Sequence, residues 1–87
     1  QVKQAYNDAR GALKAYEAAQ KTLLARKEAF DYSKERYNVG LLNAFDYNQS
    51  QSRFEQAQSD VVRTKYDYIF KLKVLEFYFG IPITDIN

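Results

Sequence analysis

Carboxylates and tyrosine hydroxyls are the most informative chemical groups of this chain, because histidine and cysteine are both absent. Their absence removes thiolate nucleophiles, imidazole acid–base catalysis, disulfides and most zinc sites. Asp31 and Glu35 stand four residues apart, and a carboxylate pair at this spacing on a helix can chelate a metal ion. No third ligand stands near them, and no residues supply a nucleophile with its base. We therefore expect no metal, no cofactor and no enzymatic activity.

Among the carboxylates, Asp46 has the position that is most informative about structure and function. It stands three residues after Asn43, as in a helix capping box, and a carboxylate is stabilised at the positive N-terminal end of a helix. A ring of symmetry-related carboxylates at the mouth of a pore would instead bind or select cations. The two interpretations are compatible. The tyrosines are expected mainly in packing, with their hydroxyls at the wet edge.

Length and charge limit the function further. At 87 residues the chain is one small domain at most, and 13 Lys and Arg against 11 Asp and Glu give a net charge of +2. This near-balance argues against nucleic-acid binding, which needs a clustered basic surface. No run of about 18 apolar residues is present, so we expect no membrane-spanning helix. The chain starts at Gln1 and has no Met, so we expect it to be a segment of a longer protein.

Residues 1–38 have the pattern of one long helix in a coiled coil. They contain no Pro and are rich in Ala, Lys, Glu, Gln and Leu, which favour helix. Apolar and small side chains recur at steps of three and four, which is typical of a coiled-coil seam. The larger set is Val2, Ala9, Tyr16, Leu23, Phe30 and Tyr37, and its companion set is Ala5, Ala12, Ala19, Arg26 and Ser33. Because the companion set begins with small residues, we expect a partner helix to approach closely there.

The segment 38–43, which we call the tip, is predicted to turn the chain into a second helix. Gly40 suits the left-handed position after a helix end, and Asn43 suits the N-cap of the next helix. Leu41 and Leu42 are an apolar pair at an exposed bend, which indicates a contact with another molecule. Because short connections join antiparallel helices, the predicted fold is all-α, an antiparallel two-helix coiled-coil hairpin with arms roughly 55 Å long.

Residues 44–79 repeat the heptad pattern and form the predicted second helix. Its seam sets are Tyr47, Phe54, Val61, Tyr68 and Leu75, with Ser50, Ala57, Thr64, Lys71 and Tyr78. A second apolar stripe consists of Val62, Ile69, Leu72 and Phe79. One antiparallel partner does not cover so wide a face, so we expect this end to pack against more than one helix. Gly80 and Pro82 are predicted to stop the helix, so the hairpin covers 1–80 and residues 81–87 form a tail or linker.

Three features of the sequence follow one another in an informative order and spacing. The turn Arg36-Tyr37-Asn38-Val39-Gly40-Leu41 comes first, Asp46 follows, and Val74-Leu75-Glu76-Phe77-Tyr78-Phe79-Gly80 ends the second helix. Together they resemble the repeat unit of TolC-type outer-membrane efflux proteins, in which an aromatic-x-Val-Gly-Leu turn joins two long helices. The ending Phe79-Gly80-Ile81-Pro82 favours the C-terminal of that family's two repeats.

This resemblance implies a homotrimeric channel for efflux or type I export. Family members place β-barrel strands in the cell outer membrane and a helical tunnel in the periplasm; this segment carries no such strands and is implied to be a periplasmic hairpin. At the tunnel entrance, the tip residues Val39, Gly40, Leu41 and Leu42 would dock to a periplasmic adaptor protein that works with an inner-membrane transporter.

The resemblance also suggests residues for the entrance itself. In one family repeat the tip carries a closing network of a Tyr, an Arg and two Asp. Tyr37 and Asp46 match two of these positions and are the entrance or pore candidates. Leu42 and Gln49 stand where the network has its Arg and its second Asp, so the residues of a salt-bridge lock are incomplete here.

Two other functions fit a long helical hairpin. One is the α-hairpin of the periplasmic adaptor itself, which normally sits between lipoyl-type β segments. The other is a generic coiled-coil scaffold without a role in transport. The flanks of the full gene discriminate the first from a channel segment, and a signal peptide would eliminate a cytosolic scaffold.

Overall fold

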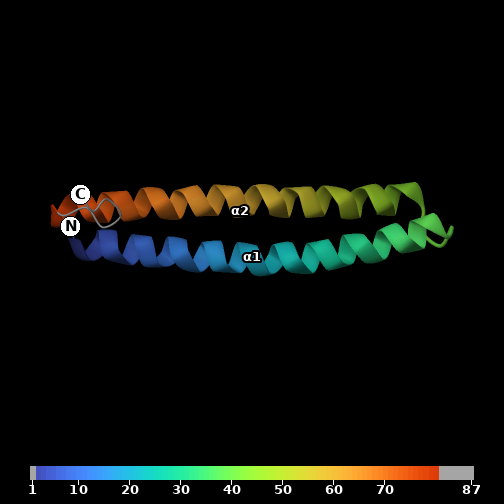
Figure 1. Cartoon of the computed structure of the whole chain (residues 1–87), viewed down its shortest axis with the longest axis horizontal. Coiled ribbons are helices and arrows are strands. Elements are labelled where there is room, and N and C mark those ends of the chain that lie inside the picture. The colour runs from blue at the N-terminus through green and yellow to red at the C-terminus, as the bar shows by residue number, and fades with distance from the viewer. Residues whose placement is uncertain (1, 81–87) are drawn as a thin grey trace, which may run out of the picture.

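In the computed structural model, the described part of the chain consists of two long antiparallel helices (Figure 1). Helix α1 spans Val2–Asn38 and helix α2 spans Ala44–Phe79. The structure describes residues 2–80 except the side chain of Phe79, so the predicted tail or linker at 81–87 lies outside the described residues. The chain measures 60 × 26 × 14 Å along its principal axes. The predicted all-α two-helix hairpin is confirmed.

The contact between α1 and α2 follows the heptad seam. Buried members of the predicted sets are Ala5, Ala9, Ala12, Ala57, Thr64 and Leu75. Ala5, Ala9 and Leu75 form one buried cluster, and Val74 packs against it. Most of these side chains are small, so the helices gain stability from close approach and many weak contacts. Arg26 departs from the pattern because its side chain is exposed, which keeps its charged head in water.

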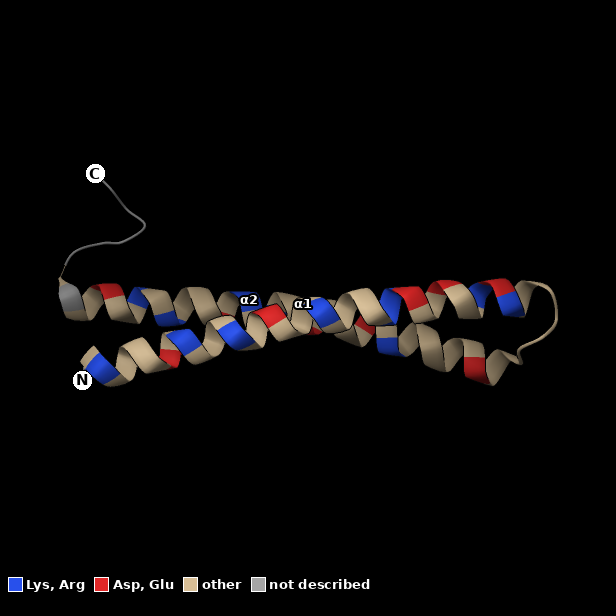
Figure 2. Cartoon of the chain, turned by 90° about the horizontal axis from the view of Figure 1, so that it is seen from below, with Lys and Arg blue, Asp and Glu red and all other residues tan. Residues whose placement is uncertain are grey.

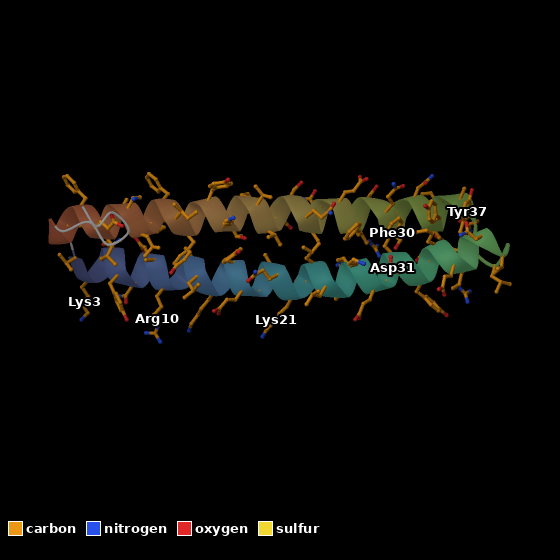
Figure 3. All side chains as sticks on the ribbon, viewed as in Figure 1. Lys3, Arg10, Lys21, Phe30, Asp31 and Tyr37 are labelled. Carbon is orange, nitrogen blue, oxygen red and sulfur yellow. The ribbon has the colours of Figure 1, made fainter. Side chains whose placement is uncertain are left out.

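The seam changes character toward the tip, where aromatic rings replace alanines. Phe30 stacks on Phe54 with ring centroids 5.5 Å apart, and it lies 5.7 Å from Tyr47. Tyr37 stacks on Tyr47 at 4.5 Å. These four rings, which we call the ring stack, alternate between the two helices. Phe30 and Tyr37 point from α1 toward α2, whereas Lys3, Arg10 and Lys21 point away from it (Figure 3).

A Schellman motif ends α1. The Leu41 N–H donates to the Arg36 carbonyl at 2.8 Å, and the Gly40 N–H donates to the Tyr37 carbonyl at 3.1 Å. Gly40 has φ +81°, a left-handed conformation that glycine adopts without steric cost. The left-handed position predicted for Gly40 is therefore confirmed.

An N-cap begins α2 a few residues later. The Asn43 side-chain oxygen accepts a hydrogen bond from the Asp46 N–H at 2.8 Å, and its carbonyl accepts one from the Tyr47 N–H at 3.1 Å. At the other end, Gly80 has φ +70° and its N–H donates to the carbonyls of Glu76 and Phe77. The start and stop signals read from the sequence lie where the backbone turns.

Charges of both signs are interspersed along the two helices (Figure 2). Lys27 pairs with Asp31 and Lys71 with Asp67, each at 3.2 Å and each within one helix. Such exposed pairs add about 0.2–0.5 kcal/mol each to their own helix. Glu76 differs from the other helix carboxylates because it is buried, with the Lys73 Nζ 3.7 Å from its carboxylate.

Candidate functional site

Three apolar side chains at the tip and just after it are largely exposed to solvent. Val39 is 69% exposed, Leu41 64% and Phe45 73%. Apolar side chains gathered at a surface indicate an interaction site rather than a folding requirement. We call Val39, Leu41 and Phe45 the tip patch. Leu42, expected to dock beside Leu41, is only partly exposed.

Backbone hydrogen bonds on both sides hold the tip patch. Val39 and Leu41 flank Gly40 in the Schellman motif, and Phe45 lies in the first turn of α2 behind the Asn43 cap. A Cβ at Gly40 would meet no atom within 4 Å, so its left-handed φ, and not crowding, is what requires glycine there. The chain thus presents its exposed apolar side chains on a turn of defined shape.

Tyr37 and Asp46, the entrance candidates, take different places at the tip. The Tyr37 ring lies against Tyr47 of the other helix, with the ring planes 10° apart, and the residue is 40% exposed. Asp46 is exposed in the first turn of α2, and its backbone N–H is engaged by Asn43. Within the described residues, the side chains of Tyr37 and Asp46 make no hydrogen bond to each other.

Phe45 is the member of the tip patch that the sequence analysis missed. It has the highest exposure of the tip patch, yet it belongs to neither seam set of the second helix. Its place outside both seam sets is the feature of the sequence that could have identified it. An apolar residue off the seam in the first turn of a helix points away from the partner helix.

A family comparison gives this geometry a context. The sequence model of the outer membrane efflux protein family matches residues 1–80. The chain belongs to this family. The match covers both helices and the tip. No curated protein and no solved structure matches the chain.

Residues 2–80 of the efflux-protein chain contain neither a membrane-spanning helix nor an acidic metal-binding cluster. No helix there is long and apolar enough to cross a bilayer. Acidic side chains there form no group of three or more suited to hold a metal ion. Asp31, one half of the carboxylate pair considered for chelation, lies 3.2 Å from the Lys27 Nζ.

Apolar side chains also remain uncovered on the part of the efflux-protein hairpin away from the tip. Val62 is 54% exposed, Ile69 37% and Phe77 82%. A groove between the helices is lined by Tyr6, Ala9, Arg10, Leu13, Tyr68, Leu72 and Leu75. Its lining is mostly apolar, and the packing of this end against further helices stays a prediction.

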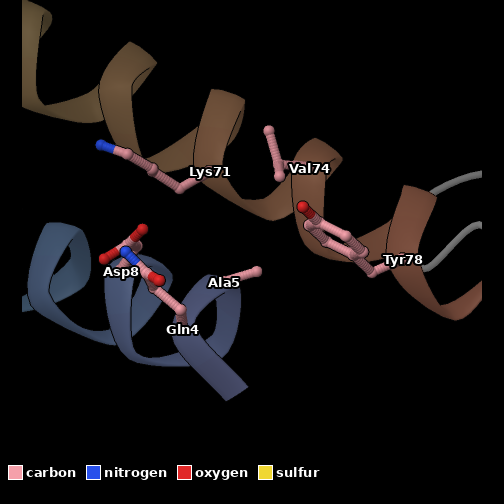
Figure 4. A pocket seen from close by; sticks show the side chains of 6 residues that line it. All are labelled: Gln4, Ala5, Asp8, Lys71, Val74 and Tyr78. Atoms are coloured by element: carbon pink, nitrogen blue, oxygen red, sulfur yellow. The ribbon is translucent and has the colours of Figure 1, made fainter. Parts of the chain in front are cut away.

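A second, more polar groove lies between the first turns of α1 and the last turns of α2 (Figure 4). It is lined by Gln4, Ala5, Asp8, Lys71, Val74 and Tyr78. Lys71 is already paired with Asp67, at 3.2 Å. Because its lining is polar and its lysine is paired within the same helix, this groove has the features of a solvated edge.

The uncovered side chains lead to a prediction for the 87-residue chain on its own. We expect it to self-associate, because Val62, Ile69 and Phe77 leave apolar area in water. Light scattering should give a molar mass that rises with concentration, and a Val62→Gln, Ile69→Gln double variant should show a smaller rise. A monomer that persists at high concentration would contradict the prediction.

Proposed function

We propose that this efflux-protein chain is a periplasmic tunnel segment of a trimeric outer-membrane channel, and that its tip docks to a periplasmic adaptor protein. The tip patch carries the proposal. Val39, Leu41 and Phe45 are all more than 60% exposed although backbone hydrogen bonds hold the turn and the start of α2 that carry them. A straight hairpin offers little concave space for a small ligand, whereas an apolar end suits a protein contact.

Family membership favours this function over the two alternatives. An adaptor hairpin and a generic scaffold share the helical pattern, but the match to outer membrane efflux proteins covers residues 1–80. The paired helices act as a wall, and opening of the entrance comes from the adaptor and from an inner-membrane transporter that engage the tip. The hairpin is a passive part of the export path, and the energy comes from that transporter.

In the proposed trimer, Tyr37 and Asp46 of each protomer line the tunnel entrance. Three exposed carboxylates in one ring would attract cations, since like charges held together bind counter-ions. Asp46 also sits in the first turn of α2, where the helix dipole stabilises its charge. The pore role would be additional to this interaction with the helix dipole, which does not depend on the trimer.

Site-specific photo-crosslinking in cells tests the docking. A photoreactive amino acid at Leu41 of the full-length protein should yield a covalent product that mass spectrometry identifies as a periplasmic adaptor. The same probe at Ala25, which is exposed in the middle of α1, is the matched control and should yield no adaptor product. Equal adaptor yields at Leu41 and Ala25 would contradict docking at the tip.

A further inference from the structure

We propose that the ring stack is a positioning device, which fixes the shape of the tip patch before a partner binds. This inference rests on the docking function proposed above. The stack consists of Tyr37, Tyr47, Phe30 and Phe54, and its three ring contacts have centroid separations of 4.5, 5.7 and 5.5 Å.

The two rings nearest the tip belong to the residues whose backbones close the turn. The Tyr37 carbonyl accepts from the Gly40 N–H at 3.1 Å, and the Tyr47 N–H donates to the Asn43 carbonyl at 3.1 Å. The ring contact between Tyr37 and Tyr47 thus joins the end of α1 to the start of α2. A change in that contact would be transmitted directly to both ends of the turn.

The tip patch has little packing of its own that would fix its shape. Val39, Leu41 and Phe45 are each more than 60% exposed, so most of their surface touches no protein atom. The ring stack supplies the aromatic contacts between the two helices beside the patch. Phe30 and Phe54 extend it by one heptad away from the tip, which fixes the rotation of each helix as well as their separation.

A fixed shape has a measurable effect on binding. A partner that recognises one arrangement of the patch binds with an apparent affinity reduced by the fraction of hairpins in that arrangement. If loss of a ring lets the helix ends splay, that fraction falls and binding weakens by about tenfold. None of the patch side chains needs to change for this to happen.

Four substitutions in the full-length protein test the inference. Tyr47→Leu removes the ring at the centre of two of the contacts, and Tyr47→Phe keeps the ring without its hydroxyl. Tyr68→Leu is the matched control, because Tyr68 belongs to the same heptad set of α2 but lies far from the tip. Tyr37→Leu is a second variant in case Tyr47→Leu fails to fold.

Two measurements report on each variant. Spin labels at Glu35→Cys and Asn48→Cys give a distance distribution across the tip without any partner, and these 87 residues contribute no other cysteine to be labelled. The adaptor cross-link at Leu41 reports docking. We expect Tyr47→Leu to broaden the distribution and to lower the cross-link yield about tenfold. Tyr47→Phe and Tyr68→Leu should retain the narrow distribution and the wild-type yield.

The remaining outcomes overturn the inference in distinguishable ways. A narrow distribution in both Tyr47→Leu and Tyr37→Leu would show that the stack does not position the tip. A broad distribution with an unchanged adaptor yield would show that docking does not depend on the tip shape, and an equal loss in Tyr68→Leu would indicate general destabilisation. Failure of the wild-type protein to cross-link to an adaptor would instead overturn the docking function, and this inference with it.

Discussion

Leu41→Asp in the full-length protein is expected to abolish export while the protein still assembles. Leu41 is 64% exposed on the turn, so the hairpin loses little folding energy when its side chain becomes charged. A buried, unpaired carboxylate in the docked complex would cost about 3–5 kcal/mol, which weakens binding by a factor of roughly 10² to 10⁴. Sensitivity of cells to exported compounds, measured beside the oligomeric state of the purified protein, checks both halves of the expectation.

Asn48→Asp separates an effect of the patch from an effect of charge near the tip. Asn48 is exposed just beyond the first turn of α2, so this variant adds the same charge beside the patch and not within it. We expect it to export normally. Normal resistance in cells that carry Leu41→Asp, or loss of export in both variants, would argue against docking through the tip patch.

Leu75→Ala should produce the largest loss of folding stability in the hairpin. Leu75 is 6% exposed and packs with Ala5 and Ala9, which are too small to fill the space that a missing isobutyl group leaves. Removal of a buried leucine costs about 2–5 kcal/mol. Helical circular dichroism of the chain during urea unfolding should therefore show a clear fall in the midpoint.

Phe77→Ala is the control for Leu75→Ala. Phe77 is larger than Leu75 and lies on the same stretch of α2, but it is 82% exposed. Its removal should change the free energy of unfolding by no more than about 0.5 kcal/mol. Both variants must be compared at a concentration where light scattering gives equal molar masses. If the two midpoints fell equally, the seam described for this end of the hairpin would be wrong.

The fold could be predicted from the sequence because its signals are local and agree with one another. The heptad spacing predicts the face that each helix buries, and Gly40 and Asn43 predict where the chain turns. Gly40 needs a left-handed φ and Asn43 a side-chain acceptor, and both requirements can be read from residue type alone. These features depend on neighbours in the sequence and not on the partner helix.

The parts that sequence reasoning missed depend on how the two helices meet. Nothing in the spacing shows that Tyr37 rests on Tyr47 and not on a neighbouring protein, because the heptad pattern gives the face but not the ring partners. Phe45 belongs to no seam set, so the heptad pattern does not identify it as a contact residue, although it is 73% exposed. The burial of Glu76 could not be predicted either, because a carboxylate on a helix is ordinarily solvated.

The ion pairs within single helices affect which residues of such a protein can be substituted during evolution. Lys27 with Asp31 and Lys71 with Asp67 are bonded along one helix, so neither pair sets the register of α1 against α2. That register is carried by alanines, leucine and aromatic rings. Outward charges can therefore be exchanged during evolution at a cost of a few tenths of a kcal/mol each. The charges along the two helices can therefore change one residue at a time while the contact between α1 and α2 stays the same.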